Sequence, residues 1–159
     1  MSLISVVIPV FNEEGNLETL YKRLAALEFA GGDRLELLFV DDGSGDRSRE
    51  IIRDLARKDP PLRAAAGPRV RYLFFSRNFG HERATTAGMD RANGEAAVII
   101  DSDLQDPPEL IPEMVRQVML RDDIASRGRI KRTNGALYGD GPGAGTDGPF
   151  PEEFNLSWQ

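Results

Sequence analysis

The sequence contains no cysteine, which excludes a disulfide framework and a thiolate metal site. Basic side chains are fewer than acidic ones, 20 against 26, and the formal net charge of −6 argues against a general affinity for nucleic acid or anionic lipid. No window approaches the run of about 18 apolar residues that a membrane-spanning helix needs. The N-terminus lacks the basic region and cleavage site of a signal peptide. We therefore expect a cytoplasmic chain whose contact with a membrane would be peripheral, at the inner face.

The order of apolar patterns indicates the fold class. Apolar runs of strand length alternate with helical patterns from residue 3 to about residue 120, which is typical of βαβ units on a parallel sheet. This rhythm predicts a Rossmann-like, doubly wound α/β fold with helices on both faces of the sheet. The four strands are expected at residues 4–10, 35–40, 70–75 and 96–100.

Helices are expected after each of these strands. The first begins at about Glu13 with Asn12 as its N-cap, because Asn is a favoured N-cap residue and acidic side chains suit a first turn. A second helix turns Ile52 and Leu55 inward, and its arginines are expected to be solvated: Arg47, Arg49, Arg53 and Arg57. A third covers residues 81–92, and Pro107 and Pro108 suit the opening of a fourth.

The pattern changes beyond residue 120. The last part of the chain is rich in glycine and proline and has too few periodic apolar positions to build a core. We therefore predict a core over residues 1–120 and an atypical tail over residues 121–159 that is poorly ordered. A loop that folds against the domain or a partner stays open as the alternative for this tail.

Polar side chains follow the carboxyl ends of all four predicted strands. In open α/β sheets ligands bind outside those ends, where the strand order reverses. A diphosphate there would be attracted by a helix N-terminus but repelled by carboxylates, and a bound Mg²⁺ or Mn²⁺ resolves this conflict. The sequence therefore favours a diphosphate carried on a divalent metal. The residues concerned are Asn12, Glu13, Asp41, Asp42, Arg77, Asn78, Asp101 and Asp103.

Each of these residues also has a purely structural interpretation. Acids after strands often serve as helix caps or turn residues, and Asp46 is better explained as a cap than as a ligand. Taken singly, Asp101 and Asp103 are better explained as loop residues. His81, the one histidine, is expected to be a surface residue in the first turn of its helix. Only the joint placement at one edge of the sheet favours a functional site.

Four sequence segments together resemble a known family. The segments are VVIPVFNEEGNL at 6–17, VDDGS at 40–44, SRNFGH at 76–81 and DSDLQDPPE at 101–109. They resemble the family 2 glycosyltransferases of the GT-A fold, and the last segment is similar to the dolichyl-phosphate mannose synthase and bacterial polyprenyl-phosphate glucosyltransferase branch. The resemblance covers about the first 118 residues, with the motifs in the right order and spacing.

The resemblance implies a nucleotide site. Pro9, Phe11 and Glu13 would line the nucleotide pocket, and Asp41 and Asp42 would hydrogen-bond the base and the ribose. It implies no firm role for Arg77 and Asn78, the motif residues that follow the third predicted strand.

The resemblance also implies a metal site and a catalytic role for the D-x-D pair. Asp101 and Asp103 would face a divalent metal, Mg²⁺ or Mn²⁺, and the diphosphate. Gln105 would be a further metal ligand.

The reaction implied is an inverting transfer of a sugar from a UDP- or GDP-sugar to a polyprenyl phosphate, dolichyl or undecaprenyl, at a membrane surface. Relatives continue with acceptor-binding elements that this sequence does not clearly offer, so a truncated nucleotide-sugar-binding module without transferase activity is the alternative. The oligomeric state, a homo-oligomer included, is left open.

Other doubly wound enzymes fit the sequence less well. A nucleotidyltransferase would favour a glycine-rich loop after the first strand, and a dehydrogenase would need G-x-G-x-x-G there. A phospho-acceptor signalling domain would need an acidic pair after the first strand and a late lysine.

Overall fold

The computed structural model describes residues 2–29, 31–58, 69–119, 130–133 and 136–139. Its centre is a four-stranded parallel sheet with the order β3-β2-β1-β4. The strands are β1 (Leu3–Val10), β2 (Arg34–Asp41), β3 (Arg69–Phe74) and β4 (Ala96–Ile99). These bounds confirm the expected strands to within one residue at each end, and the parallel pairing confirms the predicted α/β class.

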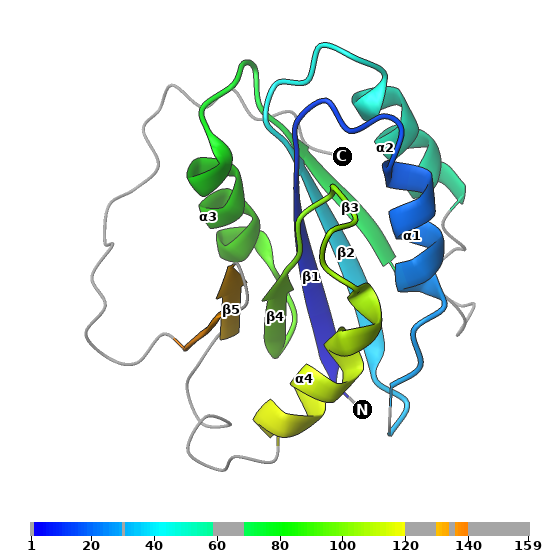
Figure 1. Ribbon diagram of the computed structural model, residues 1–159, viewed down its shortest axis with the longest axis vertical. Coiled ribbons are helices and arrows are strands. Elements are labelled where there is room, and N and C mark those ends of the chain that lie inside the picture. Colours follow the sequence, from blue (N-terminus) through cyan, green and yellow to red (C-terminus); the bar gives the residue numbers. More distant parts are fainter. Residues whose placement is uncertain (1, 30, 59–68, 120–129, 134–135, 140–159) are drawn as a thin grey trace.

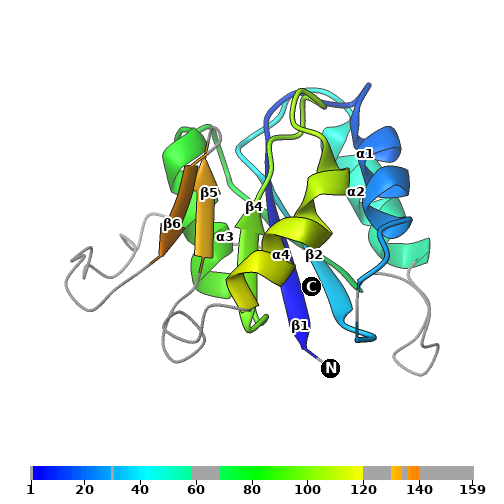
Figure 2. The same ribbon diagram turned by 60° about the horizontal axis from the view of Figure 1, so that its bottom comes forward.

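Helices cover both faces of the sheet (Figures 1 and 2). On one face lie α1 (Leu17–Ala25), α2 (Ser48–Lys58) and α4 (Ile111–Met119), the last preceded by the short 3-10 helix η1 (Pro108–Leu110). On the other face lies α3 (His81–Arg91). The sheet is therefore the middle layer of three, as expected for a doubly wound fold.

The alternation of side chains along the strands divides the core into two clusters. On β2, for example, Leu37 and Phe39 pack toward α1 and α2, whereas Leu38 and Val40 pack toward α3. Gly88 of α3 lies so close to β1 and β2 that an added Cβ would be 2.3 Å from the Val7 side chain. The strands are thus buried on both faces, which explains their nearly continuous apolar sequence.

The predicted start of the first helix is wrong. The helix α1 begins at Leu17 with Asn16 in the cap position, and Asn12 has a left-handed backbone with φ 56°. Asn12 is among the residues that adopt this conformation most readily. The segment from Asn12 to Glu14 is bound to another loop instead of coiling into the helix, and this tertiary pairing outweighs the local capping signal.

The amino ends of the strands hold a buried carboxylate. Glu36 of β2 is only 1% exposed and accepts hydrogen bonds from Ser5 Oγ at 2.6 Å and from Arg71 Nη1 at 2.7 Å. The backbone amide and side-chain amide of Asn93 each donate to it at 3.0 Å. Burial alone raises the pKa of Glu36, but these donors outweigh it and hold the pKa below its ordinary value of 4.5.

Two short strands lie in the segment for which the sequence predicts no regular structure. They are β5 (Ile130–Thr133) and β6 (Ala136–Gly139), which pair antiparallel, and β5 lies beside β4 (Figures 1 and 2). The other residues of 121–159 lie outside the described residues, so the boundary at residue 120 stays a prediction. Among the helices that the structure describes, none is long and apolar enough to cross a membrane.

Candidate active site

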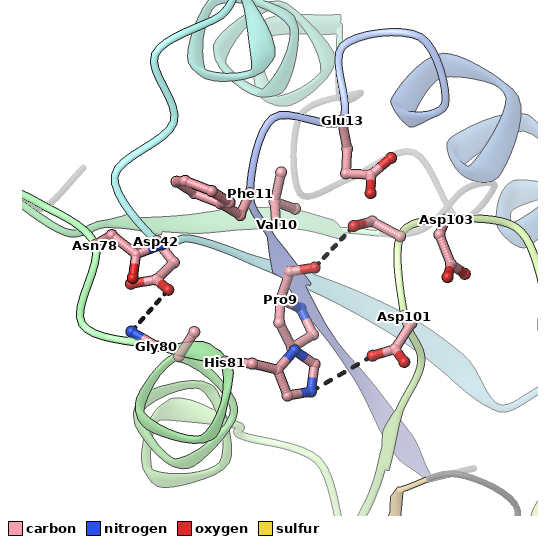
Figure 3. Close-up of a pocket in the computed structure, with 12 residues that line it drawn as sticks. Pro9, Val10, Phe11, Glu13, Asp42, Asn78, Gly80, His81, Asp101 and Asp103 are labelled. Carbon is pink, nitrogen blue, oxygen red and sulfur yellow. Dashed lines mark hydrogen bonds and ion pairs between the residues drawn. The ribbon is translucent and has the colours of Figure 1, made fainter.

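A pocket of about 370 Å³ lies at the carboxyl ends of the strands (Figure 3). It opens where the strand order reverses, between β1 and β4, which is the position expected for a ligand in this fold class. Six of the eight residues to which the resemblance assigns a role line it: Pro9, Phe11, Glu13, Asp42, Asp101 and Asp103. The other lining residues are Val10, Asn78, Gly80, His81, Ala84 and Ser102.

The loop after β1 carries Phe11 and Glu13 to the edge of the pocket. Phe11 is 47% exposed, so part of its ring is open to solvent. The carboxylate of Glu13 is half-buried and accepts a hydrogen bond from Asn16 Nδ2 at 2.7 Å. An exposed aromatic ring at a pocket edge offers a stacking surface for a flat, apolar group of a ligand.

This loop is held by the turn between β2 and α2. Asn12 N donates to Ser44 Oγ at 2.9 Å, and Gly45 N donates back to Asn12 Oδ1 at 2.8 Å. The amide of Glu13 donates to Ser48 Oγ at 2.9 Å. A fourth link runs from the Glu14 amide to Asp46 at 3.0 Å, and a fifth from the Arg47 amide to Glu14 at 2.9 Å. Backbone and side chains of both loops are thus used in fixing the pocket edge.

The neighbouring acids Asp41 and Asp42 point to opposite faces of the sheet because they are consecutive along an extended strand. Asp42 is 3% exposed and accepts the amides of Phe79 at 2.7 Å and Gly80 at 2.9 Å, which fixes the start of α3. Asp41 is completely buried and does not line the pocket. The structure therefore separates two residues that the resemblance assigns to one task.

The loop between β3 and α3 packs closely against the turn after β2. An added Cβ at Gly43, where φ is +78°, would lie 2.4 Å from the backbone of Arg77 and Asn78, so only glycine fits. Arg77 lies over the Phe79 ring at 4.2 Å, a cation–π contact, and Phe79 meets Phe75 edge-on. The loop is therefore held both by the turn after β2 and by its own aromatic contacts with Phe75.

The D-x-D turn is fixed against the first strand. Ser102 is buried, and its hydroxyl donates to the Pro9 carbonyl at 2.9 Å across the switch point. Asp103 Oδ1 accepts the Gln105 amide at 3.0 Å, and Leu104 between them has φ 66°. A left-handed leucine is strained, and such strain collects at functional turns. Gln105 is exposed and does not line the pocket.

The electrostatics of the pocket are dominated by acids. Burial raises the pKa of Asp101 above its ordinary value of 3.8; His81 lowers it, and the nearby Asp103 and Asp106 raise it. His81 Nε2 lies 3.6 Å from Asp101 Oδ1, an ion pair when the imidazole is protonated (Figure 3). His81 is the first residue of α3 and is exposed, as predicted, but it also faces the pocket.

The donor set fits a hard divalent cation in part. Asp101 and Asp103 offer the oxygen ligands that Mg²⁺ and Mn²⁺ prefer, and the repulsion between them is of the kind a cation relieves. No group of three or more His, Cys, Asp or Glu side chains among the described residues could hold a metal on its own. A cation here would therefore need oxygens from a ligand or from water to complete its shell.

Several residues that build this site escaped the sequence analysis. Arg49, expected to be solvated, binds the buried Asp41, so that expectation is wrong. Ser44, Ser48 and Ser102 each make a link between loops, and a serine with such a role carries no signal in a single sequence. The interpretation of Asp46 as a cap is confirmed, because its Oδ1 accepts the amide of the first residue of α2 at 2.9 Å.

Solved structures support the fold. The crystal structure of Staphylococcus aureus TarS residues 1–349 with UDP matches 72% of this chain and 31% of its own chain, with a TM-score of 0.55 and 22% sequence identity. The crystal structure of the same protein with UDP-GlcNAc gives a TM-score of 0.54 at 21% identity, covering 75% of this chain and 31% of that one. This likeness confirms the predicted GT-A type of α/β fold.

Curated relatives extend over most of this chain. An uncharacterised glycosyltransferase of Bacillus subtilis, YkcC, is 48% identical over 134 residues, 84% of this chain and 39% of the relative. The prophage bactoprenol glucosyl transferase homologue of Escherichia coli is 40% identical over 81% of this chain and 42% of its own. The undecaprenyl-phosphate 4-deoxy-4-formamido-L-arabinose transferase of Pseudomonas aeruginosa is 37% identical over 86% of this chain and 38% of its own.

The chain thus spans about two fifths of the length of these relatives, 38% to 42%. The match to the family itself runs over residues 5–142, which include the parallel sheet apart from the first two residues of β1, all the pocket residues and the paired strands β5 and β6. The chain therefore belongs to glycosyl transferase family 2.

Proposed function

We propose that this chain is the nucleotide-sugar-binding part of an inverting, metal-dependent glycosyltransferase that transfers a sugar to a polyprenyl phosphate. One observation carries the proposal. Four carboxylates, those of Glu13, Asp42, Asp101 and Asp103, surround a pocket that the N-terminus of α3 also borders. A helix N-terminus attracts anions and the carboxylates repel them, so a diphosphate bound with a cation satisfies both.

The nucleotide end of the donor is proposed to lie along the loop after β1. Phe11 offers an exposed ring for the base, while Pro9 and Glu13 line the same edge. The five hydrogen bonds that tie this loop to the turn after β2 support the assignment, because a rigid edge costs little ordering entropy on binding. Asp42, which follows β2, also lines the pocket and completes the proposed nucleotide site.

The diphosphate is proposed to lie between Asp101, Asp103 and the start of α3. Asp101 and Asp103 would hold a Mg²⁺ or Mn²⁺ ion, with Gln105 as a further ligand from the same turn. When bound, such an ion stabilises the negative charge that develops on the leaving diphosphate. Ser102 and its bond to Pro9 hold the two acids on one side of the pocket, and His81 stands beside Asp101 on the other.

The acceptor class is proposed from the relatives. Two of them are named for transfer to bactoprenol or undecaprenyl phosphate, and both are at least 37% identical to this chain. A phosphate oxygen is already anionic near neutral pH, so transfer to it needs no strong general base among the described residues. Transfer to a lipid-linked acceptor would bring the chain to a membrane surface as a peripheral protein.

The test is calorimetric titration of the chain with UDP, GDP and their sugar conjugates, each with and without Mn²⁺. We expect binding that depends on the metal and is weakened about tenfold or more by Asp103→Ala, since removing partners of a metal site costs about 10–100-fold. Asp106→Asn is the matched control, because this acid lies near Asp101 but does not line the pocket. Metal-independent binding, or equal losses in both variants, would contradict the metal site.

A second candidate is a nucleotide-sugar-binding module, because the pocket that carries the proposed nucleotide site lies within the described residues. A nucleotide-sugar-binding module without transferase activity would bind the donor with metal but release no nucleoside diphosphate when a polyprenyl phosphate is added. Release of UDP or GDP in that assay separates the two candidates.

A further inference from the structure

We propose that Asp41 is a positioning residue rather than a nucleotide ligand, and that it acts through Arg49 on the loop that carries Phe11 and Glu13. The proposal rests on the proposed nucleotide site. Asp41 is completely buried, and its parity along β2 directs it to the face covered by α1 and α2. The opposite orientation of Asp42 leaves that acid, and not Asp41, at the pocket.

The contacts of Asp41 show what it holds. Its Oδ1 accepts a hydrogen bond from Arg49 Nε at 2.6 Å and from the Ser44 amide at 3.2 Å. Arg49 also donates through Nη2 to the carbonyl of Phe75, just after β3, and its guanidinium lies 5.5 Å from the centre of the Phe74 ring. One ion pair therefore joins the end of β2, the first turn of α2 and the end of β3.

This ion pair continues into the pocket through the turn after β2. Ser44, whose amide Asp41 fixes, receives the amide of Asn12 on its hydroxyl, and the next residue, Gly45, donates to the Asn12 side chain. Asn12 stands between the two pocket residues Phe11 and Glu13 and has the left-handed backbone that turns the loop. The route from Asp41 to the pocket edge is thus a short series of direct hydrogen bonds.

The burial of Asp41 argues against direct contact with the nucleotide. The second oxygen of Asp41, Oδ2, is buried and has no hydrogen-bond partner in the structure, so no ligand atom reaches either oxygen without displacing the turn. A nucleotide ligand would instead need a carboxylate at the pocket surface. The ion pair of Asp41 and Arg49 is shielded on one face of the sheet, which suits a positioning role.

The test is a double-mutant cycle on nucleotide affinity with Asp41→Ala, Arg49→Ala and the pair together. Positioning through Arg49 predicts that each single variant weakens metal-dependent UDP or GDP binding about tenfold, and that the double variant binds no more weakly than the singles. Direct contact of Asp41 with the nucleotide predicts that the two losses multiply, which would overturn the proposal. Arg53→Ala is the matched control, because Arg53 lies over the same Phe74 ring at 5.0 Å without bonding to Asp41.

Two further readouts separate this role from general stability and from the proposed function. Asp41→Asn keeps the accepting oxygen and replaces the unpartnered one, so it should bind nucleotide more nearly like the wild type than Asp41→Ala does. Hydrogen exchange of the Asn12 and Gly45 amides, measured without ligand, should speed up in Asp41→Ala and Arg49→Ala but not in Arg53→Ala. Unchanged exchange would overturn the proposal, whereas a wild-type chain that binds no nucleotide would overturn the proposed function alone.

Discussion

The two ends of the parallel sheet treat carboxylates in opposite ways. At the amino end, Glu36 is buried among four donor groups, and they hold its pKa below the ordinary value. At the carboxyl end, Asp101 faces a pocket among other acids, and burial together with Asp103 and Asp106 raises its pKa although His81 opposes the shift. The first arrangement stabilises a charge in the native protein, while the second leaves a charge in need of a partner.

This difference separates structural acids from candidate functional ones within a single sheet. Perturbed pKa values mark functional sites only in part, because structural ion pairs also shift them. In this sheet, the direction of the pKa shift and the number of hydrogen-bond donors around the carboxylate distinguish the structural acid Glu36 from the candidate functional acid Asp101. Glu36 has its partners within the protein, whereas Asp101 is crowded by other acids and gains from a bound cation.

The largest effect is expected at the amino end. Glu36→Ala should lower the free energy of unfolding by about 3 kcal/mol, because it removes one partner of a buried pair and takes the carboxylate acceptor away from Arg71 and Asn93. Urea unfolding at neutral pH measures this, with the exposed Glu50→Ala on α2 as the control. Nucleotide affinity of the folded variant should stay unchanged. A loss no larger than that of the control would mean that the network contributes nothing to stability.

The loss of stability in Glu36→Ala should become smaller as the pH falls. The pKa of Glu36 is lowered in the folded protein, so its stabilisation is complete above the ordinary value of 4.5 and is lost as the pH falls through the lower folded pKa. The difference between wild type and Glu36→Ala should therefore narrow on acidification below that value. A difference that widens in acid would contradict the lowered pKa.

Two glycines give a comparison of intermediate size. An added Cβ would lie 2.6 Å from the Ser5 amide nitrogen at Gly94, and 2.4 Å from the backbone of Arg77 and Asn78 at Gly43. Alanine at either position should cost about 1–3 kcal/mol in urea unfolding, since backbone must move in both cases. Only Gly43→Ala should also weaken nucleotide binding, because Gly43 lies at the pocket end. Equal nucleotide affinities of Gly43→Ala and Gly94→Ala would contradict the distinction between the two ends of the sheet.

The sequence predicts much of this fold because the strongest signals are the continuous apolar runs. Strands such as β1 and β2 are buried on both faces, so their residue type alone identifies them. The meeting of acids at one edge follows from the parallel arrangement, and six of the eight residues to which the resemblance assigns a role line one pocket. Their proposed roles stay predictions.

The errors in the sequence analysis have tertiary causes. Asn12 carries a good local N-cap signal, but its hydrogen bonds go to Ser44 and Gly45, more than 30 residues away. Arg49 has the same helical setting as the exposed Arg53, and only the position of Asp41 decides that one is paired. Side-chain parity along β2 was the one available signal, because Asp41 shares the parity of Leu37 and Phe39, which pack under α1 and α2.

The smallest predicted effect is a gain in stability at the carboxyl end. The pKa of Asp101 is raised in the folded protein, so the ionised carboxylate lowers the stability of the native state above that folded pKa. Asp101→Asn should therefore raise the melting temperature slightly at neutral pH while weakening metal-dependent nucleotide binding, a trade of activity for stability. The advantage should vanish below the ordinary pKa of 3.8, where the wild-type carboxyl is protonated as well.

Melting curves of the wild type and Asp101→Asn over a pH series measure this gain, with the exposed Asp90→Asn at the other end of α3 as the control. The sign of the stability difference from the wild type is the decisive result. As the pH rises to neutral, Glu36→Ala should become less stable than the wild type, whereas Asp101→Asn should become more stable than the wild type. A variant of Asp101 that is less stable than the wild type at neutral pH would place Asp101 with Glu36 among the structural acids. The cation proposed for the pocket would then lose its electrostatic support, since the acid expected to need a partner would already have one in the protein.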